Sequence, residues 1–480
     1  AESLLLAGLG GAAGLGLGWW GVRMLAALQP EGMLPVHDIT LSWRVLLYVS
    51  GAAALSALLC GAAPMLWTGR RVPADVLRDE GRTASGGRRA RHWGDVLLAS
   101  QVALALTLTL GAGLLVRSYL RLQRVGPGFD SHNVLAVQLT LPGTRYDSTR
   151  KVLAFYAELE RQARALPGAE AAALVSLVPL GPSSWSSQMA IAGRQPIDGQ
   201  VVHRELSPEY QRVMRVPLLR GRLLSEADRQ DAPYVVLINE TLARTYFRGE
   251  DPLGQRLIFD RVPDSTSNWR TVVGVVGDER QSSLAVDPQP EILEPYPQES
   301  RNGMTLLIRT ANDPASLAPA ARRLVARLDP LLAISSIKTM DEVRSQSLAR
   351  DRFLAVLMLA FAGVGMVLGI VGVYGVVAQL ARRRMREMGI RIALGARGTQ
   401  VQWLVVRHGV TVTGIGIGLG LLLALAATRV IRTLLFQVAP TDPLTFMAVP
   451  VLVLLTAGLA SWLPAARASR ADPCQVLRMD

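Results

Sequence analysis

Six apolar runs, each long enough to cross a lipid bilayer, constrain the fold of this chain more than any other feature of its sequence. A helix needs about 20 apolar residues to cross a hydrocarbon core about 30 Å thick. The runs cover residues 4–28, 45–67, 96–116, 353–380, 401–431 and 446–463. They predict an α-helical membrane protein with six transmembrane helices.

The arginines predict how these helices are oriented. The connection 68–95 carries seven arginines and 381–400 carries six, whereas 28–43 and 433–443 carry none. Basic connections stay in the cytoplasm. We therefore expect both ends of this segment to be cytoplasmic and residues 117–352 to lie on the opposite side of the membrane.

The composition excludes an ordinary soluble protein and argues against nucleic-acid binding. Half of the residues are hydrophobic (50%) and 19% are charged, and the mean hydropathy is +0.27. A net charge of +13 could suit nucleic acid. However, the arginines cluster beside apolar runs and form no basic groove interleaved with aromatic residues, so we expect no nucleic-acid partner.

The residues that usually carry catalysis or bind cofactors are sparse. Cys60 and Cys474 are the only cysteines, so the chain has no disulfide framework or thiolate metal site. Histidines occur at positions 37, 92, 132, 203 and 408 without metal-ligand spacing, and we interpret them as incidental. A phosphate-binding loop needs Gly-Lys-Ser/Thr, but neither Lys151 nor Lys338 follows a glycine. We expect no enzyme activity, cofactor or metal.

An internal repeat relates the two ends of the chain at a constant spacing of 400 residues. Gly14, Gly16 and Gly18 reappear as Gly414, Gly416 and Gly418, and the segment 76–78 reappears as 476–478. A regular repeat of this kind indicates duplication. We expect the chain to hold the tail of one unit followed by a complete second unit, and the natural polypeptide to continue upstream.

The long segment between the third and fourth apolar runs alternates between strand-like and helical patterns. Leu135, Val137, Leu139 and Leu141 alternate as in a strand, and a helical stripe follows at Val152, Phe155, Tyr156, Leu159 and Ala163. Further strands are expected at 234–238, 271–276, 304–309 and 333–338, with a helix at 317–328. The pattern predicts a large mixed α/β domain, which could form two lobes.

The stretch 382–397 is short, basic and amphipathic. At helical spacing Met385, Met388 and Ile392 share one face, while Glu387 precedes Arg391 by four residues on another. The pattern fits a docking helix, but it equally fits a solvated basic loop that obeys the rule for cytoplasmic charge.

A family resemblance favours the docking helix. Residues 386–391 (Arg-Glu-Met-Gly-Ile-Arg) and 393–396 (Ala-Leu-Gly-Ala) resemble the cytoplasmic loop of MacB-like and FtsX-like ABC transporter permeases. Four stretches look like the periplasmic core domain of that family, at 218–222, 236–240, 251–254 and 273–278. Residues 440–443 and 471–478 look like its C-terminal module.

The resemblance implies four regions in a bacterial inner-membrane protein. They are two last helices of a first unit with a cytoplasmic linker (1–92), a third transmembrane helix (93–120), a MacB-like periplasmic core domain (121–350) and an FtsX-like permease domain with three helices (351–480). A full transporter would then require the missing first permease unit or a second permease copy.

The resemblance also implies a function and its site. A separate cytoplasmic ABC ATPase would hydrolyse ATP and dock on a coupling helix, in which we single out Arg386, Glu387, Gly389, Arg391 and Gly395. The permease would then export hydrophobic or peptide-like cargo. Alternatively, it would transmit the ATPase motion to a periplasmic partner, such as a cell-wall hydrolase, without moving cargo.

Overall fold

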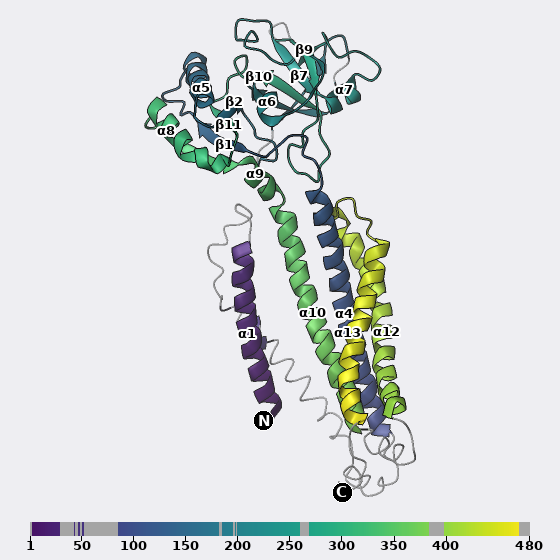
Figure 1. Cartoon of the computed structure of the whole chain (residues 1–480). Helices are drawn as coiled ribbons and strands as arrows, with labels where there is room; N and C mark the ends of the chain where they lie inside the picture. The colour runs from purple at the N-terminus through teal and green to yellow at the C-terminus, as the bar shows by residue number, and fades with distance from the viewer. Residues whose placement is uncertain are drawn as a thin grey trace. The chain divides into compact units, whose positions relative to one another are not determined.

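The computed structural model describes two compact units of the chain (Figure 1). The described residues are 2–28, 43, 47–48, 50–51, 85–181, 185–194, 197, 199–259, 268–383 and 398–469. Residues 1–121 and 350–480 form one unit, and residues 122–349 form the other. We call them the helical unit and the α/β unit.

The described part of the helical unit consists mainly of long helices. They are α1 (Glu2–Leu28), α4 (Ser85–Gln123), α10 (Ala349–Arg383), α12 (Gly398–Ile431) and α13 (Pro443–Ser469). The short 3₁₀ turn η3 (Arg432–Leu434) follows α12. Within the described residues, four stretches are long and apolar enough to cross a membrane: His92–Gln123, Ala349–Arg382, Val406–Leu434 and Pro443–Pro464.

These four stretches correspond to the third to sixth predicted spans. The first predicted span is helical, as α1, and the second lies almost entirely outside the described residues. The count of six transmembrane helices therefore stays a prediction.

Helix α4 is the most enclosed of the four candidate membrane helices. Of its span, 44% is buried, compared with 17–33% for the other three. Leu98, Val102, Leu106 and Leu110 recur at every fourth position of α4, and all four are buried. This spacing places them on one helix face, where they pack in a cluster with residues of α10, α12 and α13.

In the part of the α/β unit that the structure describes, the strands form one 12-stranded sheet. Its strands are β1 (Val134–Thr140), β2 (Ala169–Val175), β3 (Ser186–Gln188), β4 (Ala190–Ile191), β5 (Gln200–Leu206), β6 (Leu218–Gly221), β7 (Val235–Asn239), β8 (Arg256–Ile258), β9 (Arg270–Val276), β10 (Glu291–Pro295), β11 (Gly303–Thr310) and β12 (Ile334–Thr339). The order is β12-β1-β11-β2-β5-β10-β7-β9-β8-β4, with β3 beside β5 and β6 beside β9. β5 pairs in parallel with β10, and β7 pairs in parallel with β9.

Among the described residues of this unit, six short helical elements accompany the sheet. They are α5 (Thr149–Arg164), α6 (Tyr210–Met214), α7 (Glu240–Tyr246), the 3₁₀ turn η2 (Pro314–Leu317), α8 (Ala318–Leu328) and α9 (Met340–Ser347).

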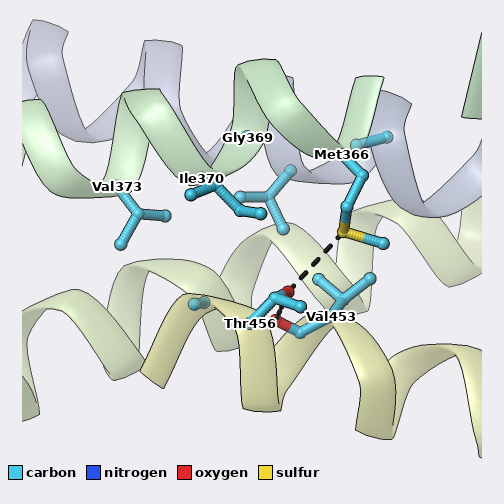
Figure 2. Close-up of a pocket in the computed structure, with 9 residues that line it drawn as sticks. Met366, Gly369, Ile370, Val373, Val453 and Thr456 are labelled. Carbon is cyan, nitrogen blue, oxygen red and sulfur yellow. Dashed lines mark hydrogen bonds between the residues drawn. The ribbon is translucent and has the colours of Figure 1, made fainter. Parts of the chain in front are cut away.

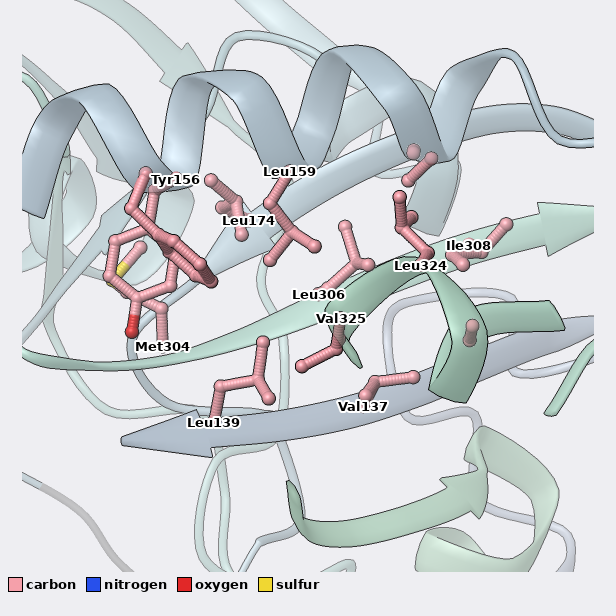
Figure 3. Packing of buried hydrophobic residues seen from close by; sticks show 14 of the residues in the cluster. Val137, Leu139, Tyr156, Leu159, Leu174, Met304, Leu306, Ile308, Leu324 and Val325 are labelled. Carbon is pink, nitrogen blue, oxygen red and sulfur yellow. The ribbon is translucent and has the colours of Figure 1, made fainter. Parts of the chain in front are cut away.

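Two hydrophobic cores lie along this sheet. The first packs α5 and α8 against β1, β2 and β11 (Figure 3), and it contains every residue of the predicted helical stripe in α5. The second surrounds β7 and β9, where Val236, Ile238, Val272 and Val275 pack with Phe247. The two lobes that the sequence allowed are thus two cores on one continuous sheet.

Two glycines from the family-like stretches bring β6 and β9 close together. Gly221 and Gly274 are register partners. A Cβ atom on Gly221 would lie 2.3 Å from the carbonyl oxygen of Val273, and one on Gly274 would lie 2.3 Å from that of Arg222. Gly221 also has a backbone φ of +78°, which residues with a side chain rarely adopt. Any larger residue would force the two strands apart.

Candidate functional site

The five residues of the predicted coupling helix lie outside the described part of the chain. Arg386, Glu387, Gly389, Arg391 and Gly395 all fall within 384–397. The described helices on either side are α10, which ends at Arg383, and α12, which begins at Gly398. The role of these five residues therefore stays a prediction.

Near its first residues, α4 is tied to α12 by one polar pair. His408 Nε2 lies 3.0 Å from Asp95 Oδ1, and both side chains are mostly buried. Asp95 is ten residues into α4, and His408 is ten residues into α12. The pair is therefore close in sequence to the start of α12, which directly follows the predicted coupling segment.

Near its last residues, α4 is tied to the start of α13. Arg117 donates a hydrogen bond to Asp442 Oδ2. The same carboxylate oxygen accepts the Thr445 N–H at 3.0 Å and the Thr445 hydroxyl at 2.8 Å. Asp442 therefore caps a helix whose first residue is Pro443, a favoured combination at a helix start. This aspartate belongs to the 440–443 stretch that carries the family resemblance.

Two further contacts hold the connection between α12 and α13 to α4. Ser118 Oγ accepts the backbone N–H of Phe436 at 2.8 Å. Arg121 donates to the backbone carbonyl of Gln437, a residue with φ +49°. α4 is thus attached to the other helices near both of its ends.

Between these ends, glycines allow α12 to approach α4 closely. A Cβ atom on Gly416 would lie 2.8 Å from the carbonyl oxygen of Ala99, and one on Gly420 would lie 2.8 Å from that of Ala103. Gly418, between them, has nothing within 4 Å. The closest approach therefore follows a Gly-x-x-x-Gly spacing, which favours tight helix pairs in lipid.

A small apolar pocket lies between α4, α10 and α13 (Figure 2). Its lining residues are Val102, Ala105, Met366, Gly369, Ile370, Val373, Val453, Thr456 and Ala457. The Thr456 hydroxyl donates to the backbone carbonyl of Val453 at 2.9 Å and lies 3.6 Å from the Met366 sulfur. Because Thr456 already satisfies its hydroxyl within its own helix, the pocket offers apolar surface and little polar recognition.

A fully buried arginine lies at the middle of the sheet in the α/β unit. Arg204 on β5 is 0% exposed and makes salt bridges with Glu279 and Glu291. Tyr210 OH accepts a hydrogen bond from Arg204 at 2.9 Å and donates one to Glu279 at 2.9 Å. Gln281 donates to Glu291 at 2.9 Å. Every charge in this network has a partner, as burial requires.

The environment of Glu291 raises its pKa to about 7, because burial disfavours the charged carboxylate. Arg204 opposes this shift and Glu279 adds to it. Burial also raises the pKa of Tyr210, which keeps this hydroxyl protonated and able to donate.

Sequence reasoning missed a second polar cluster in the same sheet. His203, Glu205 and Glu294 are buried together on β5 and β10. The interpretation of all five histidines as incidental overlooked His203, because its partner Glu294 is 91 residues away in the chain. Only the pairing of β5 with β10 brings them together.

The chain has several long apolar helices, and a mixed α/β unit is inserted between its third and fourth predicted spans. This arrangement defines a polytopic membrane protein with a large extramembrane domain. Residues 102–327 match the model of the MacB-like periplasmic core domain. Residues 359–473 match the model of the FtsX-like permease C-terminal domain. The chain therefore belongs to the MacB-like and FtsX-like family of ABC transporter permeases.

Curated relatives with export names match parts of the chain. The pyoverdine export ATP-binding/permease protein PvdT of Pseudomonas savastanoi pv. phaseolicola is 28% identical over 276 residues, which covers 54% of this chain and 40% of that protein. The macrolide export ATP-binding/permease protein MacB of Rhodospirillum rubrum is 27% identical over 420 residues, which covers 83% of this chain and 61% of that protein. This chain thus spans less than two thirds of either relative.

Among solved structures, the periplasmic region of MacB from Actinobacillus actinomycetemcomitans covers 47% of this chain with 16% identity. The match includes 96% of that structure, and its TM-score is 0.33.

Proposed function

We propose that this chain is the permease part of an ATP-driven exporter in the bacterial inner membrane. A separate cytoplasmic ABC ATPase hydrolyses ATP and docks on the segment 382–397. Residues 121–350 lie in the periplasm, and the ends of this segment lie in the cytoplasm, as the distribution of arginines favours. A further permease unit, either a first unit or a second permease copy, completes the transporter.

The attachment of α4 near both of its ends supports the part of this proposal that concerns transmission of ATPase motion. The Asp95–His408 pair and the Arg117–Asp442 pair join α4 to α12 and to the start of α13. A helix held in this way moves with its neighbours when they move. Because α4 leads covalently into the α/β unit and α10 leads out of it, motion imposed next to the coupling segment reaches both chain connections of that unit.

The cargo in this proposal is a hydrophobic or peptide-like molecule. Two relatives carry names for the export of pyoverdine and of macrolides, which supports export as the direction of transport. The alternative is a regulator that transmits the same motion to a periplasmic partner, such as a cell-wall hydrolase, without moving cargo. The attachment of α4 supports this alternative equally, because it concerns transmission of motion and not a path for cargo.

The docking part is tested with two variants, Glu387→Lys and Gly395→Trp, reconstituted with the cognate ATPase. The helix pair that Glu387 would form with Arg391 is worth only about 0.2–0.5 kcal/mol, so its loss leaves the permease folded. We expect each variant to reduce ATPase binding and permease-stimulated hydrolysis at least tenfold. Glu226→Lys is the matched charge reversal, since the Glu226 side chain is 89% exposed in the α/β unit.

Folded Glu387→Lys and Gly395→Trp variants that bind and stimulate the ATPase like the parent would refute the docking assignment. The segment 382–397 would then act only as a topology signal.

Proteoliposomes distinguish export from regulation. If the parent complex is an exporter, ATP should drive movement of a hydrophobic dye or a labelled peptide across the bilayer. Stimulated ATP hydrolysis without movement of either probe would favour the regulator.

A further inference from the structure

Three potential metal ligands meet on adjacent strands of the α/β unit. His203 and Glu205 are two residues apart on β5, so their side chains point to the same face of the sheet. Glu294 on β10 is the register partner of Glu205. These side chains are 6%, 3% and 2% exposed, respectively. One ligand atom from each lies within 4.8 Å of the other two.

Two of these residues have buried polar atoms without a hydrogen-bond partner among the described residues. They are both ring nitrogens of His203 and Glu294 Oε2. His203 Nδ1 lies 3.7 Å from Glu294 Oε2 and 3.9 Å from Glu205 Oε1. Leaving such atoms unpaired is costly, so a further group between them would stabilise the fold.

The spacing fits a shared cation better than a shared proton. A charged imidazolium approaches a carboxylate to about 2.7–2.9 Å, much closer than either distance here. Zinc lies about 2.0–2.2 Å from nitrogen and oxygen ligands, so two ligands at a tetrahedral angle are about 3.4 Å apart. Angles of about 120–140° at the metal would give the observed separations of 3.7 and 3.9 Å.

Two arginines orient the carboxylates as outer partners commonly do in metal sites. Arg270 donates to Glu294 Oε1 and leaves Oε2 free. Arg301 donates to Glu205 Oε1 at 2.9 Å. The ring of Phe259 stacks on the imidazole with the ring centres 4.7 Å apart. The aromatic ring and the two arginines restrict how the three ligands can rearrange.

We propose that His203, Glu205 and Glu294 bind one divalent transition-metal ion such as Zn²⁺, which accepts both imidazole nitrogen and carboxylate oxygen as ligands. The ion would link β5 to β10 beside the buried Arg204 network, midway along the sheet. It would stabilise the α/β unit.

The test uses the full chain in detergent, with Cys60 and Cys474 replaced by serine so that no thiolate competes. After removal of metal and reloading with Zn²⁺, we expect one tightly bound ion per chain. His203→Gln and Glu294→Gln should each weaken binding at least tenfold. His132→Gln is the matched control, because His132 Nδ1 lies 3.1 Å from a carboxylate of Asp341 but both side chains are exposed; it should bind like the parent.

Bound Zn²⁺ should also raise the melting temperature of the parent and of His132→Gln, but not that of His203→Gln. Circular dichroism checks the fold of each variant. X-ray absorption of the Zn²⁺-loaded parent provides a measurement that needs no variant, and it should show a single imidazole with oxygen ligands. A parent that binds no stoichiometric metal, a bound ion without an imidazole ligand, or full binding by both folded ligand variants would overturn the proposal.

Discussion

At the scale of single residues, the α/β unit depends on charges buried in the middle of its sheet. Arg204 neutralises Glu279 and Glu291, and all three are 0–1% exposed. A buried ion pair adds little compared with apolar packing, but removal of one partner leaves an unpaired buried charge, at a cost of about 3–5 kcal/mol. The network therefore makes this sheet sensitive to a single substitution.

Arg204→Leu should destabilise the α/β unit by about 3–5 kcal/mol, because both glutamates lose their main counter-charge. Hydrogen-exchange protection of peptides from β5 and β10, measured in the full chain, provides the readout. The matched control is Arg212→Leu, since Arg212 is 72% exposed and lies 3.4 Å from Glu209. An exposed pair contributes about 0–1 kcal/mol, so equal effects of the two substitutions would contradict the assigned role of the network.

Glu291 should make the stability of the same strands depend on pH. Its pKa is raised from 4.5 to about 7 in the folded chain, so the folded state retains a proton that the unfolded state has released. Stability from this group should therefore fall as pH rises from about 4.5 to about 7. Hydrogen exchange between pH 5 and pH 8, corrected for intrinsic rates, should show this slope in the parent and a smaller one in Glu291→Gln. An unchanged slope would assign the pH dependence to other groups.

At the scale of elements, the apolar pattern of the sequence was sufficient to locate strands and helices whose apolar residues are buried. Strands β7, β9 and β11 and helix α5 lie where the sequence predicted them. Strand β12 does as well, although none of its residues is fully buried. β5 and β10 were not predicted, because their buried positions include charged residues such as Arg204 and Glu291 that resemble a surface pattern. Only long-range pairing satisfies these charges. For the same reason the sequence could not reveal the His203 cluster.

For the coupling segment 382–397, the sequence gives a prediction that the described residues do not test. Its residue pattern and its family resemblance single out Glu387 and Gly395. A sequence pattern alone does not establish the local structure of these residues or what they contact. The contacts at the end of α4 could be predicted only in part. The arginines that follow the third apolar run were visible in the sequence, whereas their partners, such as Asp442, depend on how the helices pack.

The close approach of α12 to α4 gives a prediction for glycine substitutions. In Gly416→Leu, the new Cβ atom would lie 2.8 Å from the backbone oxygen of Ala99, so the helices must separate. Such overpacking costs about 1–3 kcal/mol, and we expect a lower melting temperature in detergent or nanodiscs. Gly418→Leu is the matched control, because its Cβ atom meets nothing within 4 Å. If Gly418→Leu destabilises the chain as much as Gly416→Leu, helix contact is not the cause.

At the scale of the whole molecule, the proposed orientation in the membrane depends on the arginine content of the short connections between apolar runs. In the chain, the α/β unit is inserted between α4 and α10. If all six predicted spans cross the membrane, the basic connections 68–95 and 381–400 lie on the same side, opposite to residues 117–352. The proposed orientation therefore has the α/β unit in the periplasm and the predicted ATPase contact in the cytoplasm.

Single cysteines test this orientation in a chain whose Cys60 and Cys474 have been replaced. Cysteines at Ser85 and Thr399 should be shielded from impermeant thiol reagents in whole cells and should react after the cells are opened. Cysteines at Ser282 and Asn312, which are exposed on the α/β unit, should react in whole cells. Because positive residues resist translocation, the two groups should differ completely and not by degree. Labelling of Ser85→Cys and Thr399→Cys in intact cells, with Ser282→Cys and Asn312→Cys protected, would reverse the orientation and place the segment 382–397 beyond the reach of a cytoplasmic ATPase.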